Sequence, residues 1–154
     1  MKLNSVIAAT ALLCTGTWVN AQMLKDNSRI TGEARKKAGN NYELVLHMKL
    51  EKGWHIYSMN PGGDGMLFGP KILFKKDPKV ALQGGVQEKG KMISEVIIES
   101  DPKVNMYNDK VDYVQQAVIK GATEVSGTYQ YQICNEKGFC LPPAKKEFKI
   151  VVKG

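Results

Sequence analysis

Apolar and polar residues alternate with a period of two along much of the chain, most clearly between residues 42 and 51. The apolar positions of this segment are Tyr42, Leu44, Leu46, Met48 and Leu50. The positions between them are mostly polar: Glu43, Val45, His47, Lys49 and Glu51. Successive side chains of a β-strand point to opposite faces of the sheet, so this spacing predicts one apolar face and one mostly polar face.

Eight further runs are short, β-rich and free of any long stretch with a period of 3.6 residues. Together with the first they predict strands over residues 29–36, 42–50, 54–57, 71–75, 79–86, 92–99, 111–119, 125–134 and 145–152. Lys52-Gly53 predicts a turn and Asn60 to Gly65 a long irregular loop. Nine short strands separated by Gly, Pro, Asp and Asn favour an all-β fold, an immunoglobulin-like β-sandwich. With no internal repeat and no linker, we expect a single domain over residues 22–154.

The first 21 residues have a different character. Lys2 supplies their only charge, residues 6–13 are apolar, and Val19-Asn20-Ala21 ends in a small residue. This order is typical of a cleavable signal peptide, so we predict export and a mature chain that starts at Gln22. A buried N-terminal helix is the competing interpretation, but the apolar stretch is short. Lipid attachment at Cys14 is disfavoured because Leu13, rather than a small residue, precedes it.

The charge of the chain is basic, with 22 Lys+Arg against 15 Asp+Glu in 154 residues and a formal net charge of +7. Only Arg29 and Arg35 are arginines, and the lysines are scattered singly or in pairs. Phosphate and base recognition favours clustered arginines, so we expect no nucleic-acid partner. After residue 21 no apolar run is long enough for a membrane-spanning helix.

Two cysteines, Cys134 and Cys140, remain after the expected cleavage, and in an exported chain such a pair indicates a disulfide. Cys134 ends a predicted strand, on the face opposite Tyr129 and Tyr131. A hairpin-like turn that brings the two sulfurs together is favoured by the sequence between and after the cysteines. The five intervening residues include the turn formers Asn135 and Gly138, and the prolines of Leu141-Pro142-Pro143 have no amide donor. Closing a seven-residue loop stabilises the fold by only about 2.4 kcal/mol. Spacing alone still leaves a structural disulfide and a redox-active pair equally open, because a C-x5-C spacing is not by itself a redox signature.

The residues around these cysteines form a recognisable motif. Tyr131-Gln132-Ile133-Cys134, Glu136, Gly138-Phe139-Cys140 and Leu141-Pro142-Pro143 closely resemble the signature of the N-terminal periplasmic domain of DsbD-type thiol:disulfide interchange proteins. Upstream, Gly53-Trp54-His55-Ile56-Tyr57 resembles the aromatic strand of that domain. The resemblance extends loosely over about residues 25–152.

The resemblance implies a periplasmic immunoglobulin-like domain whose pair Cys134 and Cys140 relays electrons. A membrane-embedded thiol reductase, acting in trans, would reduce the pair, which would then reduce disulfide isomerases and thioredoxin-like proteins of cytochrome c maturation. By position, Cys140 is the sulfur at which partners attack. Trp54 and Tyr57 are candidate aromatic neighbours of the pair, and Glu136 and Phe139 candidate binding residues. The stretch matching the family's protective cap loop is Glu99 to Val104, which lacks the expected aromatic residue.

Other residues indicate no further chemistry. His47 and His55 have no vicinal ligands for a metal, so we interpret both as surface or edge polarity and expect no metal and no cofactor. The charges nearest the pair, Glu136 and Lys137, oppose each other, and the predicted fold offers no helix N-terminus to favour a thiolate. We therefore expect slow exchange outside a docked complex. The chain would be one part of a protein-disulfide reductase system, and the alternative is a non-catalytic binding or scaffold module with a structural disulfide.

Overall fold

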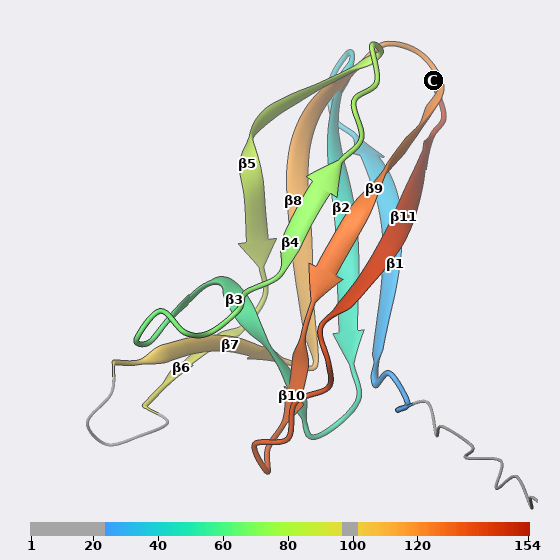
Figure 1. Cartoon of the computed structure of the whole chain (residues 1–154). Helices are drawn as coiled ribbons and strands as arrows, with labels where there is room; N and C mark the ends of the chain where they lie inside the picture. The colour runs from blue at the N-terminus through green and yellow to red at the C-terminus, as the bar shows by residue number, and fades with distance from the viewer. Residues whose placement is uncertain (1–23, 97–101) are drawn as a thin grey trace, which may run out of the picture.

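The structure is a computed structural model that describes residues 24–96 and 102–154, and it is all-β throughout these ranges (Figure 1). Its strands are β1 (Ser28–Lys36), β2 (Asn41–Leu50), β3 (Trp54–Gly62), β4 (Lys71–Phe74), β5 (Val80–Lys89), β6 (Met92–Glu95), β7 (Val104–Asn108), β8 (Lys110–Ile119), β9 (Thr123–Tyr131), β10 (Ile133–Asn135) and β11 (Ala144–Val152). Within the described ranges no helix is long and apolar enough to cross a membrane.

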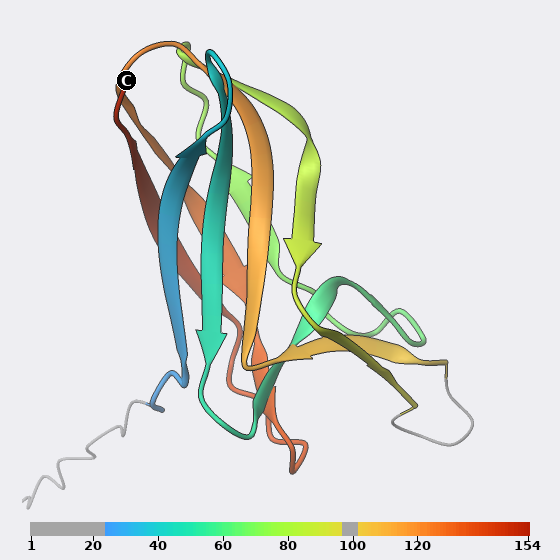
Figure 2. The same ribbon diagram turned by 180° about the vertical axis from the view of Figure 1, so that it is seen from behind.

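The strands form three antiparallel sheets. One has the order β1-β2-β8-β5 and a second β11-β9-β4. These two sheets lie face to face as the layers of a sandwich, and both views show it (Figures 1 and 2). The third sheet, β10-β3-β7-β6, closes one end of the sandwich and is called the end sheet below. The predicted immunoglobulin-like β-sandwich is confirmed.

The core lies between the two layers. The apolar row predicted on β2 is buried and faces aromatic and aliphatic side chains of the opposite layer. Contributions from that layer include Val125, Tyr129, Phe148 and Ile150. The end sheet adds its own inward row, namely Ile56, Tyr107 and Ile133. One core therefore joins the sandwich to the sheet that carries Cys134.

The outer face of β2 is less exposed than its polar pattern predicts. Glu43 and Val45 are buried there. Glu43 accepts a hydrogen bond from Gln116 (3.1 Å) and lies 3.0 Å from the ammonium group of Lys37. Gln116 and Lys37 thus cover the carboxylate of Glu43 on this face.

The observed strands differ from the predicted ones in four places. The strand β7 was not predicted, because Val104, Met106 and Tyr107 are all buried and no alternation marks it. β3 continues to Gly62 through an irregular register where a loop was expected from Asn60. The run 125–134 is two strands, since the chain leaves one sheet at Gln132 and joins another. The predicted strand 92–99 ends at Glu95 as β6, and its residues 97–99 lie outside the described residues.

Candidate functional site

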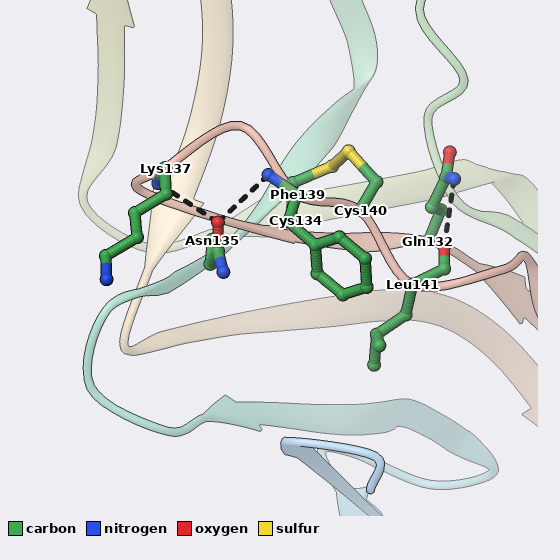
Figure 3. Close-up of a disulfide and its surroundings, with 7 residues drawn as sticks. All are labelled: Gln132, Cys134, Asn135, Lys137, Phe139, Cys140 and Leu141. Carbon is green, nitrogen blue, oxygen red and sulfur yellow. Dashed lines mark hydrogen bonds between the residues drawn. A yellow bond between two sulfur atoms is a disulfide. The ribbon is translucent and has the colours of Figure 1, made fainter. Parts of the chain in front are cut away.

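Cys134 and Cys140 form a disulfide across a five-residue turn that follows β10 (Figure 3). The two residues are paired in an isolated antiparallel bridge. The amide of Leu141 donates to the carbonyl of Ile133 (3.0 Å), and the amide of Asn135 donates to the carbonyl of Phe139 (2.8 Å). Hydrogen bonds that flank a pair in this way mark the narrower type of antiparallel pair. The Cα atoms are accordingly 3.9 Å apart, closer than the roughly 4.4–6.8 Å usual for a disulfide.

The turn between the cysteines is organised by Asn135. Its side-chain oxygen accepts hydrogen bonds from the amides of Lys137 (3.0 Å) and Phe139 (3.0 Å), as Figure 3 shows. Gly138 follows with a φ of 77°, a conformation that glycine adopts without steric cost. On the other side of the loop the side-chain amide of Gln132 (Nε2) donates to the carbonyl of Leu141 (3.0 Å). These bonds fix the hairpin that the motif predicted.

The two sulfur-bearing residues differ in exposure. Cys134 is 2% exposed, whereas Cys140 is on the surface. An incoming thiolate or disulfide can therefore reach Cys140 first. Cys134 is held behind it, in the ladder between β10 and β3.

The disulfide lies in the wall of a shallow pocket of about 430 Å³ on the outward face of the end sheet. Tyr57 and Glu136, both expected near the pair, line this pocket together with the two cysteines. The rest of the lining comes mainly from β3, β6 and β7: His55, Glu95, Val96, Met106 and Asn108. The structure thus brings a tyrosine, a methionine and two carboxylates to the pair.

Trp54 and Phe139 lie elsewhere. Trp54 pairs with Asn135 in the ladder and packs, partly buried, against the core. It is one position away from His55, so the period of two places it on the opposite face of the sheet from Cys134. Phe139 is 50% exposed on the turn itself, where a docking protein can contact it (Figure 3).

His55 is the residue that the sequence analysis misjudged. It is directly opposite Cys134 in the ladder, and its Nε2 atom is buried without a hydrogen-bond partner among the described residues. Its ring packs edge-on against the ring of Tyr57, with the two ring centroids 5.4 Å apart. The interpretation as surface or edge polarity therefore misses the burial of this ring nitrogen, although His55 does line a surface pocket. His55 is two positions from Tyr57 and therefore on the same face of the strand, which could have indicated that it lies near the cysteines. The sequence does not show, however, which strand pairs with this one.

The pocket's electrostatics follow from burial and two carboxylates. Burial lowers the pKa of His55 below its ordinary value, and the charges of Glu136 and Glu95 partly oppose this effect. Burial also raises the pKa of Tyr57.

His47 lies away from the pocket, on the outer face of β2 between Asp112 (2.7 Å) and Glu33 (3.2 Å). No group of three or more possible metal ligands occurs within residues 24–96 and 102–154.

The predicted cap stretch falls only partly within the structure. Glu99 to Asp101 lie outside the described residues. Lys103 is exposed, and Val104 is buried at the start of β7. Glu95 and Val96, at the end of β6, line the pocket just before this stretch.

With this geometry in place, the comparison with sequence families identifies the chain's relatives. Residues 20–152 match the family described as thiol:disulfide interchange protein DsbD, N-terminal. The chain belongs to this family. The match includes the whole cysteine hairpin and the strand of Tyr57, so the DsbD resemblance read from the motif is confirmed.

Similar solved structures have low sequence identity to this chain, and the first of them shows the same fold. The N-terminal periplasmic domain of ScsB from Proteus mirabilis is 14% identical, with a TM-score of 0.58 over 81% of this chain and 46% of that chain. The chain thus spans under half of that relative's length. The reduced DsbD N-terminal domain of Neisseria meningitidis is 15% identical, with a TM-score of 0.45 over 81% and 86%. A chain from the complex between the DsbD N-terminal and PilB N-terminal domains of the same organism is 14% identical, with a TM-score of 0.47 over 78% of this chain and 80% of that chain. A comparison with curated proteins found no match.

Proposed function

We propose that this protein is a periplasmic thiol-disulfide exchange module that relays electrons through Cys134 and Cys140. A membrane-embedded thiol reductase reduces the pair, and the reduced pair reduces thioredoxin-like proteins, including disulfide isomerases and proteins of cytochrome c maturation. The observation that carries this proposal is a disulfide with one exposed and one buried cysteine, set in a pocket on a member of the DsbD N-terminal family. The signal-like residues 1–21 support export to that compartment.

The difference in exposure supports a particular order for the exchange. The thiolate of Cys140 attacks a partner's disulfide and forms a mixed disulfide, releasing one partner thiolate. Cys134 then attacks the sulfur of Cys140, which re-forms the internal bond and releases the second partner thiolate. The partner gains two electrons, and two protons leave the cysteines.

A structural disulfide is the alternative that we consider less well supported. Only seven residues are closed by the bond, so its contribution to stability is about 2.4 kcal/mol. The hairpin is also held by the hydrogen bonds of Asn135 and of the Ile133–Leu141 pair without help from the sulfurs. The disulfide lies at an open pocket and contributes little to the stability of the fold. Both features fit a role in thiol-disulfide exchange better than a structural role.

Trapping of partners tests the relay. In a Cys134→Ser variant the mixed disulfide at Cys140 has no cysteine to resolve it, so we expect covalent adducts with thioredoxin-like proteins of the periplasm. Non-reducing electrophoresis and mass spectrometry of periplasmic extracts identify them. The matched Cys140→Ser variant keeps only the buried Cys134 and should give at most a tenth of the adduct. If neither variant captures a thioredoxin-like protein, the relay is wrong.

A further inference from the structure

His55 occupies a position that the proposed exchange leaves without a role. In the antiparallel ladder it lies directly across from Cys134, with Asn108 of β7 on its other side. Directly opposed residues on neighbouring strands have Cβ atoms about 4.5–5.5 Å apart and side chains on the same face. The imidazole therefore neighbours the sulfur of Cys134, the buried member of the pair.

The Nε2 atom of His55 lacks a partner in the oxidised protein. It is buried and makes no hydrogen bond to any described residue. Buried polar atoms are rarely left unpaired, and those that are require an explanation. A disulfide sulfur offers no proton and accepts one only weakly, whereas a thiol donates and a thiolate accepts. Reduction of Cys134 would create the partner that Nε2 lacks.

We propose that His55 is the proton acceptor for Cys134 and so activates this cysteine as the resolving thiol. The inference rests on the exchange function proposed above and assigns the order of proton transfer within it. The groups that surround the imidazole are Cys134 on β10, Glu136 on the turn, Glu95 on β6 and Tyr57 on β3, with the neutral Asn108 on β7. The two carboxylates favour the imidazolium that forms when the proton arrives.

In the mixed disulfide, Nε2 of His55 takes the proton of the Cys134 thiol. The thiolate attacks the sulfur of Cys140, the Cys134–Cys140 bond forms, and the bond from Cys140 to the partner breaks. The electron pair leaves on the partner's sulfur, which takes the proton from the imidazolium. His55 is then neutral again and Cys134 is oxidised. In the reverse direction His55 returns a proton to Cys134 as the internal bond opens.

A small aromatic disulfide that releases a coloured thiolate tests this step without any protein partner. Reduced protein mixed with it releases two equivalents: the first when Cys140 attacks, the second when Cys134 resolves. Cys134→Ser removes the second phase and so assigns it. For His55→Gln at about pH 7 we expect the second phase to slow at least tenfold, with the first phase changed less than twofold. The second phase of this variant should also speed up with rising pH, because without His55 the Cys134 thiol must ionise on its own.

His47→Gln is the matched control, since His47 is the only other histidine and lies on the outer face of β2. It should change neither phase, and it assigns both imidazole resonances in nuclear magnetic resonance spectra. If His55→Gln does not fold, the wild-type spectra decide, because the titration of His55 must then change on reduction of the disulfide. The proposal is overturned if the second phase is equally fast in the wild type and in His55→Gln. It is also overturned if His55 titrates identically in the oxidised and the reduced protein. A His55-dependent second phase in a protein that traps no partner would refute the relay alone.

Discussion

Replacing both cysteines by serine is expected to abolish electron transfer while leaving the domain folded. Disulfide reduction by the reduced protein should fall to the level without protein, because no other cysteine remains after residue 21. The free energy of unfolding should fall by only about 2.4 kcal/mol, out of about 5 to 15 kcal/mol for a typical domain. Insulin or glutathione disulfide reduction measures the first effect, and urea denaturation measures the second.

The hydrogen bonds of the hairpin explain why the fold survives. Asn135 accepts two amide hydrogen bonds across the turn, and the bond between Leu141 and Ile133 closes its base. None of these involves sulfur. A double variant that unfolds under native conditions would show that the bond is the staple of this hairpin, and it would favour the scaffold alternative.

Replacing Gly127 by alanine is expected to give the largest loss of stability from a single methyl group. Gly127 lies in β9, opposite Phe74 of β4 on one side and Phe148 of β11 on the other. The two rings pack edge-on across it, with centroids 5.3 Å apart. A methyl group at this position overlaps both the ring of Phe148 and the carbonyl oxygen of Leu73. Backbone cannot yield as a side chain can, so we expect a loss of about 3 kcal/mol.

Gly85→Ala is the control for this substitution. Gly85 is an exposed residue of β5, and a methyl group there meets no atom within 4 Å. Its effect on the free energy of unfolding should stay within about 0.5 kcal/mol. Urea denaturation of the two variants measures the difference, and equal stabilities would contradict the packing described for β9.

The sequence predicts the sandwich and the cysteine hairpin for definite physical reasons. The alternation around Leu46 marks a strand with one buried face, and its apolar row is the row that enters the core. Around the cysteines the signal is local, since Asn135, Gly138 and the two prolines suit a turn that brings close residues together. Both predictions depend only on neighbours along the chain.

The predictions that failed depend on pairing between distant segments. In β7 the neighbouring residues Met106 and Tyr107 are both buried although they point to opposite faces of the sheet, so no alternation marks the strand. Nothing in the sequence around Gln132 marks the passage from one sheet to the next. His55 has the same difficulty, because its environment is set by Cys134, which is 79 positions further along the chain. Its burial becomes visible only when β10 is placed beside β3.

The reduction potential of the Cys134–Cys140 bond tests the central claim most directly. Equilibration of the protein with glutathione redox buffers, read out by alkylation of free thiols and intact mass, gives this value. A bond that relays electrons must open in exchange with its partners, so we predict a potential above about −300 mV. A potential below about −300 mV is that of a structural disulfide and would contradict the relay.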